Sequence, residues 1–409
     1  MISAPRGTHD VLPDEQPAWA QIVDTFRELA ERYGYRPITT PTIEHTELIE
    51  RTSGQGSDIV QKEIYTFEDR SGRSLALRPE ATAPVARAYL EHGLHRQPQP
   101  VKTYLVGPMF RYDRPQRGRY REFWQLNVEA MGAADPALDA EVIRLYHNLL
   151  DRLGIQRYWL ELNSIGDRQC RPGYIEELNR WLDAHPDVLT PEVVQKRETS
   201  PLRVFDVKDE RVRARLADAP KIGESLCAEC RQHFDDVRHY LDAYGVAYRV
   251  EPTLVRGLDY YTRTAFEVLG EALGAKDSIC GGGRYDYLIE EIGGPPTPGV
   301  GWAAGIERLV IQLQEEGRAA DRDGSLDVFL VAGESERVEA LQTLSELRAA
   351  GLAADADYAG RSQNAQIKHA NRIGSRYVVI LSGQEATVRE RGREDREVAR
   401  ADLVSELRK

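Results

Sequence analysis

Two strand-like runs joined by a short polar loop constrain the fold of this chain more than any other feature of its sequence. Residues 102–113 and 119–131 are rich in apolar side chains, and residues 114–118 form the polar loop between them. Antiparallel pairing is the simplest arrangement for two strands that are connected so tightly. A second hairpin is predicted where residues 65–67 and 75–77 alternate on either side of a turn. The sequence therefore predicts an antiparallel sheet.

Helical segments flank these strands. Apolar residues recur at helical spacing over residues 19–33, and Gly34 is a natural stop. Residues from about 167 to 246 are charged, helix-like and interrupted by prolines, and they lack the alternation of strands. Strand-like chain then resumes and reaches a glycine cluster at 281–283, and a helix over about 304–316 follows. We interpret residues 167–246 as a helical insertion in a sheet domain.

The last part of the chain has a different pattern. After a polar stretch, strand-like and helix-like segments alternate as βαβαβ, with strands at 327–331, 352–357 and 377–381, which predicts a parallel sheet. A chain of 409 residues is too long for one compact core. We therefore expect two domains, residues 1–324 with the helical insertion and residues 325–409 with an α/β fold.

Composition narrows the function classes. No apolar run approaches the ~18 residues of a membrane span, and the first residues lack a signal peptide, so we expect a cytoplasmic protein that does not enter a membrane. Four cysteines are too few for disulfide bonds to stabilise a chain of this length, and reduced thiols are expected. The formal net charge of −12 argues against a protein that coats nucleic acid nonspecifically. Any nucleic-acid site must be a local patch.

Arginines concentrate around the loop of the central hairpin. Residues 111–121 contain five arginines and one acid. Planar guanidinium groups bind phosphates through two hydrogen bonds at once, so this density suits polyphosphate, although an isolated charged run is more often a solvated loop. The strand that follows alternates, and we expect its polar face to form a binding floor with cations at one end and a carboxylate at the other. The expected binding face holds Arg119, Arg121, Phe123, Gln125, Asn127 and Glu129, and the expected core face holds Tyr120, Glu122, Trp124, Leu126, Val128 and Ala130.

Several segments resemble motifs of one enzyme family, the class II aminoacyl-tRNA synthetases, in the form that histidyl-tRNA synthetases use. The central hairpin resembles the second signature motif of the class. Residues 256–261 are the most specific match, because this element separates histidyl enzymes from other class II synthetases. The resemblance spans nearly the whole chain. The matching segments are 6–10 (RGTHD), 77–82 (LRPEAT), 106–111 (VGPMFR), 118–123 (GRYREF), 256–261 (RGLDYY), 282–286 (GGRYD) and 299–308 (GVGWAAGIER).

This resemblance implies a fold and a reaction. The fold is α+β: an antiparallel sheet of six or more strands flanked by helices, with a helical insertion and a C-terminal α/β anticodon-binding domain. The implied protein is a homodimer that activates L-histidine with ATP and Mg²⁺ to histidyl-adenylate, and then transfers histidine to the 3′ end of tRNA(His). Fixed cations contribute most of such catalysis, since charge grows on the transferring phosphoryl oxygens.

The resemblance also assigns residues. Arg111 and Arg256 would be catalytic, contacting the α-phosphate between histidine and ATP. The remaining histidine ligands would be Glu80 and Thr82 at the amino group, Gln125 beside them, Glu129 and Tyr261 at the two imidazole nitrogens, and Tyr260 alongside. The remaining ATP ligands would be Asp113, Arg119 and Arg308, and the acceptor end of the tRNA would meet Arg114, Gln116 and Arg117.

At five positions the chain departs from the family's usual residue. Glu122 and Trp124 replace Gln and His, and both fall on the face expected to be core, so they should not touch substrate. Asp113 is a shorter acid than the usual Glu. Ala81 replaces a Gly and adds a methyl between two predicted ligands. Tyr287 also stands where the family has Gly.

Other interpretations stay open. Cys227 and Cys230, with His233 three residues on, resemble half of a zinc site, but a second pair is lacking, and the metal is left unassigned. One rival function is a synthetase-like regulatory paralogue that binds histidine and partners an ATP phosphoribosyltransferase. Another is a sensor or interaction module on an inactive synthetase core. Retention of the four phosphate-binding arginines and of the C-terminal domain favours the ligase.

Overall fold

The chain forms two compact units, which divide between residues 320 and 321. The structure is a computed structural model that describes residues 2–54, 57, 59–273, 277–320 and 326–408. The domain boundary expected between residues 324 and 325 lies outside the described residues. None of the described helices combines the length and the apolar character that crossing a bilayer requires.

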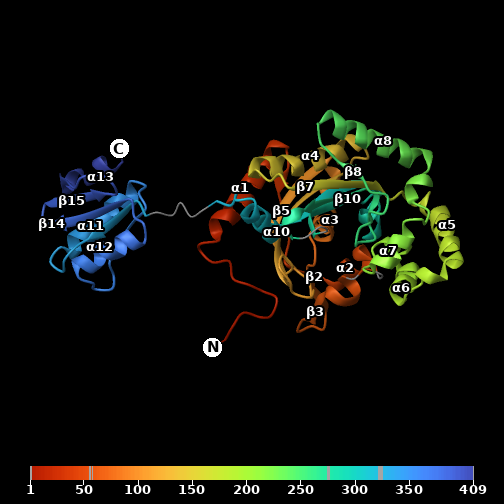
Figure 1. Ribbon diagram of the computed structural model, residues 1–409, viewed down its shortest axis with the longest axis horizontal. Helices are drawn as coiled ribbons and strands as arrows, with labels where there is room; N and C mark the ends of the chain where they lie inside the picture. Colours follow the sequence, from red (N-terminus) through yellow and green to blue (C-terminus); the bar gives the residue numbers. More distant parts are fainter. Residues whose placement is uncertain (1, 55–56, 58, 274–276, 321–325, 409) are drawn as a thin grey trace. The chain divides into compact units, whose positions relative to one another are not determined.

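The predicted central hairpin lies inside a large sheet of the first unit (Figure 1). Within the described residues this sheet has eight strands, and its pairs are antiparallel except at the two ends, where β1 pairs with β5 and β7 with β8 in parallel. The predicted antiparallel sheet is confirmed. Its strands, in spatial order, are β1 (Arg36–Pro37), β5 (Val101–Phe110), β6 (Glu122–Met131), β11 (Gly299–Gly305), β10 (Asp277–Arg284), β9 (Thr262–Gly270), β7 (Tyr158–Ser164) and β8 (Arg249–Val250).

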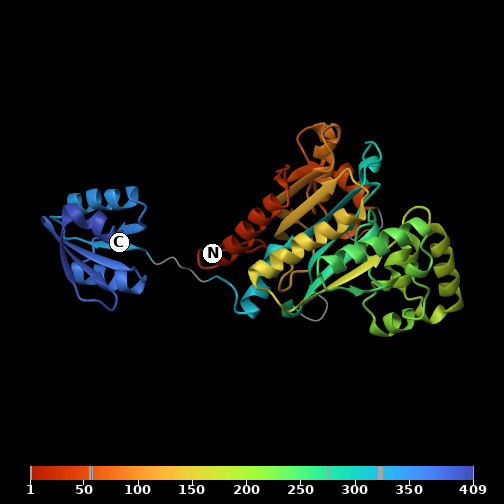
Figure 2. The ribbon, with the colours of Figure 1, turned by 90° about the horizontal axis from the view of Figure 1, so that it is seen from above.

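Helices cover one face of this sheet and bury the largest apolar core (Figure 2). The first of them is the helix expected at residues 19–33; a proline in its first turn favours its start, and Gly34, at φ 79°, follows its end. Strand β6 turns Leu126, Val128 and Ala130 toward this core, as its alternation predicts. The covering helices are α1 (Gln16–Arg32), α4 (Pro136–Leu153), α8 (Ala228–Ala243) and α10 (Ile306–Glu315).

The expected core face is wrong at the start of β6. Glu122 is exposed, and Trp124 is 39% exposed with its ring edge against Trp19 of α1. This end of the strand lies at the rim of the helical layer, so alternation there does not mean burial. Neither residue lines the cavity described below, as expected.

The opposite face carries smaller elements and a second core. Helix α3 packs on β6 and on α9, and the predicted hairpin of residues 65–77 is present as two strands of a three-stranded sheet. Part of this face stays uncovered and forms the floor of a cavity. The elements on this side are α2 (Thr46–Ser53), α3 (Thr82–Glu91), α9 (Leu288–Glu291), and the small sheet of β2 (Ile43–His45), β4 (Ser74–Leu77) and β3 (Tyr65–Glu68).

The helical insertion is also confirmed, with one difference. Helices α5 (Arg171–Ala184), α6 (Pro191–Thr199) and α7 (Glu210–Leu216) surround a small core of their own and lie to one side of the sheet (Figure 1). Helix α8 falls inside the predicted insertion but packs on α4, β7 and β9, where Val237 and Leu241 join the main core. The insertion proper therefore ends where α8 begins.

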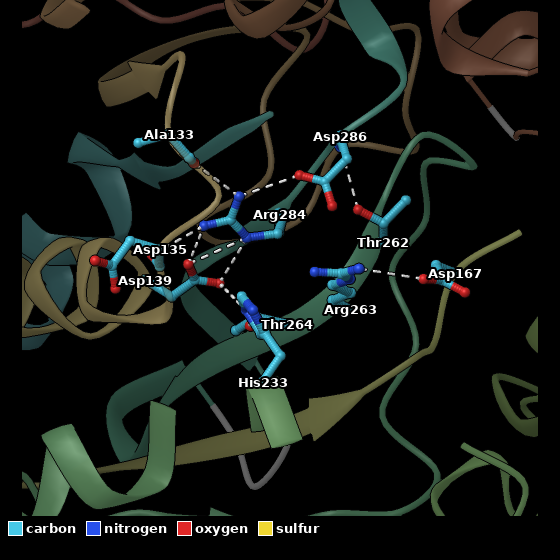
Figure 3. Close-up of polar contacts among 10 residues, drawn as sticks. All are labelled: Ala133, Asp135, Asp139, Asp167, His233, Thr262, Arg263, Thr264, Arg284 and Asp286. Atoms are coloured by element: carbon cyan, nitrogen blue, oxygen red, sulfur yellow. Dashed lines mark hydrogen bonds and ion pairs between the residues drawn. The ribbon is translucent and has the colours of Figure 1, made fainter. Parts of the chain in front are cut away.

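A buried ionic network ties α8 to the sheet. Arg284 of β10 and Asp139 of α4 are both fully buried and share two hydrogen bonds of 3.1 Å through the arginine Nε. His233 of α8 contacts the same carboxylate at 3.2 Å, and Asp286 pairs with Arg284 at 3.1 Å (Figure 3). Burial favours the neutral acid, but the charge of Arg284 outweighs it and lowers the pKa of Asp139. The network fixes three elements that are distant in sequence.

The second unit has the predicted α/β arrangement. Strands β12, β13 and β14 are parallel, and β15 and β16 extend the sheet as an antiparallel hairpin. Helices α11 and α12 link the parallel strands. The elements are β12 (Val328–Val331), α11 (Arg337–Ala349), β13 (Ala354–Ala356), α12 (Gln363–Arg372), β14 (Tyr377–Ser382), β15 (Glu385–Glu390), β16 (Arg396–Ala399) and α13 (Leu403–Leu407).

Candidate active site

A cavity of about 420 Å³ opens over strands β6, β10 and β11 of the first unit. The start of α3, the loop that follows β5 and the loop over residues 255–261 form its walls. The structure brings most of the sequence-predicted site residues to this one cavity. Those that line it are Glu80, Thr82, Arg111, Asp113, Arg119, Gln125, Arg256, Tyr260, Tyr261 and Arg308.

Two buried carboxyl groups lie at one end. Glu80 precedes α3 and accepts hydrogen bonds from the backbone N–H groups of Thr82 (2.6 Å) and Ala83 (2.8 Å), so it also caps that helix. Burial raises the pKa of Glu80. The methyl of Ala81 packs into the core beside α3 and does not line the cavity, so this departure leaves the space between the two predicted ligands unchanged.

Glu129 lies directly behind the cavity wall. It does not line the cavity, but the hydroxyl of Thr82 donates to its Oε1 at 2.7 Å and the hydroxyl of Tyr285 donates to its Oε2. Burial raises the pKa of Glu129 to about 8. Gly301 on the neighbouring strand makes room for this carboxyl, because a Cβ there would lie 2.1 Å from Oε2.

Arginines gather around the rest of the cavity. Arg111 donates through Nε to the carbonyl of Pro79 at 2.8 Å, and Arg308 donates through Nε to the carbonyl of Gly118 at 2.9 Å. Arg119 faces Asp113 at 3.7 Å. These contacts hold the guanidinium groups to backbone and to one acid, so the positive charge is fixed before any ligand arrives.

Arg256 is held from two sides. Its Nη1 lies 3.1 Å from Oε1 of Glu267, and its guanidinium occupies the space that a Cβ at Gly281 would need, 1.9 Å from Nη2. Burial works against the charged form, but the Glu267 carboxylate outweighs it and raises the pKa of Arg256. This arginine stays charged inside the cavity.

Besides Glu129, three predicted residues lie outside the cavity. Arg114, Gln116 and Arg117 are exposed on the loop between β5 and β6. The backbones of Gln116 and Arg119 close this loop with two hydrogen bonds of 3.2 and 2.9 Å, and Arg117 pairs with Glu315 of α10 at 2.6 Å. Tyr287, the remaining departure, also lies outside, with Arg168 3.8 Å above its ring.

Tyr285 and Glu267 were not among the residues predicted for the site. Both line the cavity and orient a predicted ligand, Glu129 and Arg256 respectively. Glu267 is the acidic member of an otherwise apolar strand segment and Tyr285 lies within a matched motif, so each had a signal. Their partners come from other segments, Glu129 from β6 and Arg256 from the loop before β9, and that pairing was not visible in the sequence.

The fold and the cavity define a class of protein. An antiparallel sheet flanked by helices, with a cavity over the sheet and a separate α/β unit after it, is the fold of a class II aminoacyl-tRNA synthetase. The comparisons agree, because the family described as histidyl-tRNA synthetase matches residues 7–167 and 177–309, and the anticodon binding domain matches residues 327–409. The chain belongs to the histidyl-tRNA synthetase family.

Individual relatives resemble the chain over all or most of its length. A histidine–tRNA ligase of Halothermothrix orenii is 48% identical, covering 100% of this chain and 99% of its own. One of Desulforudis audaxviator is 50% identical over 94% of this chain and 92% of its own. The crystal structure of apo histidyl-tRNA synthetase from S. aureus superposes with a TM-score of 0.85 at 35% identity, and both chains are fully covered. An ATP phosphoribosyltransferase regulatory subunit/histidyl-tRNA synthetase from Bacillus halodurans C has a lower TM-score of 0.65 at 25% identity, over 90% of this chain and 96% of its own.

Proposed function

We propose that this chain is a histidine–tRNA ligase that activates L-histidine with ATP and transfers it to tRNA(His). The observation that carries this proposal is one cavity with two separate chemistries. Buried carboxyl and tyrosine groups lie at one end, and four arginines lie around the rest. A cationic, NH-bearing amino acid suits the first group and a polyphosphate suits the second.

The acidic end would select histidine. Glu80 and Thr82 would hold the amino group, with Gln125 beside them. The Thr82 hydroxyl donates to Glu129, and an imidazole N–H of bound histidine would donate to the same carboxyl. Tyr261, with Tyr260 against it at a ring distance of 4.6 Å, would address the other ring nitrogen. Amino acids without two ring nitrogens would leave these groups unpaired, at a cost of roughly 1–3 kcal/mol for each group.

The arginines would drive adenylation. Arg111 and Arg256 would contact the α-phosphate as the histidine carboxylate attacks it, and Arg119 and Arg308 would hold the outer phosphates. Charge grows on the phosphoryl oxygens in this step, so cations that are already fixed stabilise the transition state more than the bound substrates. Asp113 would lie beside the nucleotide, where its carboxylate faces Arg119.

The cavity also fits a divalent cation. Glu307 lines it, and Oε2 of this carboxylate is buried without a hydrogen-bond partner among the described residues. Mg²⁺ arriving with ATP would supply positive charge to the outer phosphates, and we propose Glu307 as a ligand or as a partner of its water shell. Burial raises the pKa of Glu307 to about 7, which a bound cation would reverse.

Transfer needs contacts to tRNA. We propose that the exposed Arg114, Gln116 and Arg117 meet the acceptor end, and that the second unit binds the anticodon. Residues 325–409 contain thirteen Lys and Arg and fourteen Asp and Glu, so this part is nearly neutral, whereas the rest carries almost all of the net charge of −12. A homodimer and a cytoplasmic location belong to the same proposal.

Histidine-dependent exchange of pyrophosphate into ATP, followed by charging of tRNA(His), tests the function. A ligase performs both reactions. The regulatory paralogue would bind histidine without charging tRNA, and an inactive synthetase core would fail in the exchange itself.

A further inference from the structure

Three cysteines and one aspartate meet where the helical insertion joins the sheet. Asp167 and Cys170 precede α5, and Cys227 and Cys230 lie at the start of α8. The three sulfur atoms and a carboxylate oxygen all lie within 4.8 Å of one another. Cys227 is partly buried and the other three residues are buried, and all three cysteines are free thiols. Four groups that can bind a metal therefore converge from two distant segments.

The two segments share one local geometry. In each, the ligand atom of the first residue accepts a hydrogen bond from the backbone N–H three residues on. Cys230 N lies 3.4 Å from Cys227 Sγ, and Cys170 N lies 3.4 Å from Asp167 Oδ1. This turn brings the first and fourth side chains to the same side, and a pair of ligands with two residues between them is the usual spacing in structural zinc sites.

We propose that Asp167, Cys170, Cys227 and Cys230 bind one structural Zn²⁺ ion. Zinc takes four ligands in a tetrahedron, and metal–sulfur bonds of about 2.3 Å place sulfur atoms about 3.8 Å apart. The observed limit of 4.8 Å therefore requires a contraction of at most about 1 Å. Three sulfur ligands disfavour Mg²⁺ and Ca²⁺, which prefer oxygen.

The surroundings leave room for these ligands and balance their charge. Gly166, at φ 62°, precedes the first ligand, and a Cβ there would lie 2.6 Å from Cys170 Sγ. Arg263 Nη2 lies 3.4 Å from the Asp167 carboxylate (Figure 3). Its backbone N–H donates to the carbonyl of Gly166 at 2.7 Å, although φ of 49° is unusual for a residue with a side chain. One cation is thus held beside a ligand set with an excess of negative charge.

His233, the third member of the sequence pattern, is not a ligand. Its Nε2 lies 3.2 Å from Asp139 and 3.4 Å from the Thr264 hydroxyl (Figure 3). The apparent half-site of the sequence is completed by Asp167 and Cys170 instead. The missing second pair of ligands therefore exists, with one carboxylate in place of a thiolate.

The cluster also connects to the cavity. Arg171, next to Cys170, donates to the carbonyl of Tyr261 and to that of Ile165 at 2.9 Å. Zinc would fix this arginine and thereby the backbone of Tyr261, and it would also join the two segments that border the small core of the insertion. Loss of zinc should then raise KM for histidine more than KM for ATP; only this kinetic readout rests on the proposed function.

Metal analysis of the full-length protein, purified without a polyhistidine tag, tests the site directly. Elemental analysis should find one zinc ion per chain. Cys227→Ser should lose it, whereas Cys280→Ser, which alters the one cysteine outside the cluster, should keep it. Asp167→Cys should also keep the ion, since it converts the set to four thiolates, and Asp167→Ala should hold it more weakly.

Cobalt provides a readout that needs no folded variant. Co²⁺ added to the metal-free, unaltered protein should give tetrahedral d–d bands and thiolate charge-transfer absorption, and the charge-transfer band should strengthen in Asp167→Cys. Absence of these bands, or equal zinc loss from Cys227→Ser and Cys280→Ser, would overturn the proposal. A Cys227–Cys230 disulfide in freshly purified, metal-free protein would do so as well and would assign the pair a redox role.

Discussion

Replacing Glu129 with glutamine removes a titrating group from the proposed imidazole site and preserves its size. The carboxyl accepts hydrogen bonds from Thr82 and Tyr285, and burial raises its pKa to about 8. Only the ionised form can accept strongly from an imidazole N–H, because charge-assisted hydrogen bonds are roughly twice as strong as neutral ones. Histidine binding should therefore improve as the pH rises through the pKa of Glu129.

The size of the effect follows from that pKa. A carboxyl group with a pKa of about 8 is ionised to a fraction of about 0.09 at pH 7 and about 0.5 at pH 8. KM for histidine should fall about fivefold across this unit of pH, since affinity scales with the ionised fraction. Glu129→Gln should weaken histidine binding at every pH and abolish the slope, whereas KM for ATP should change little.

Pyrophosphate exchange measured between pH 6.5 and 8.5 tests this pH dependence of KM for histidine. Wild type and Glu129→Gln should be assayed over the same range of histidine concentrations. Glu44→Gln is a matched control, because Glu44 is a buried carboxylate paired with Arg87 outside the cavity. If wild type and Glu129→Gln have parallel pH profiles, or if both substrates are weakened equally, Glu129 is a structural group and the imidazole assignment fails.

Thermal stability provides an independent test of the raised pKa of Glu129. The folded-state pKa of Glu129 is raised above the ordinary value of 4.5, so the folded chain holds a proton that the unfolded chain releases. The protonated carboxyl therefore adds to the free energy of unfolding at low pH. This stabilisation is lost as the pH rises from about 5 to 8, by about 1.4 kcal/mol per pH unit. Ligand-free Glu129→Gln should lack this slope and should melt higher than wild type at pH 8 by calorimetry.

Three further predictions concern other parts of the chain. Arg256→Ala should lower the single-turnover adenylation rate far more than it weakens ATP binding, since its charge acts as the α-phosphate is attacked; an unchanged rate in the folded variant would exclude that role. Arg284→Met should destabilise the first unit by about 3–5 kcal/mol in denaturant titrations, because it leaves the buried Asp139 without its arginine partner; a change within about 0.5 kcal/mol would contradict the network. Truncation at Gly324 should keep histidine-dependent exchange, provided that any dimer survives, and lose most tRNA charging, because one of two separated tRNA contacts disappears. Full charging by the truncated protein would refute the anticodon-binding assignment.

Local patterns predicted much of the fold. The hairpin of β5 and β6, the first helix and the βαβαβ order of the second unit all follow from periodicity and turn residues, which act within a few neighbours. Alternation failed at Glu122 and Trp124, since burial depends on where the covering helices end and not on the strand itself. It gave the correct side for Leu126 and Val128, over which those helices lie.

The site was predictable where a recognisable motif carried the signal. The matched hairpin and the segment 256–261 pointed to one pocket, and the structure brings Arg111, Arg119 and Arg256 together there. The partners of these residues could not be predicted, because Glu267 and Arg256, or Tyr285 and Glu129, meet only when separate segments of the chain are brought together by the fold. The proposed zinc ligands also come from two distant segments. In addition, Asp167 is not a thiol, and His233 lies closer in sequence to Cys227 and Cys230 although it contacts Asp139 instead.

Helix α8 limits how this protein can be shortened or recombined. Its first turn carries two of the clustered cysteines, His233 in the next turn completes the network around Arg284, and its later turns fill the core over β7 and β9. Excising all of residues 167–246 would therefore strip a layer from the catalytic sheet. A shortened chain therefore has to keep α8, and we expect natural length variation to concentrate in the helices before it, which surround a core of their own.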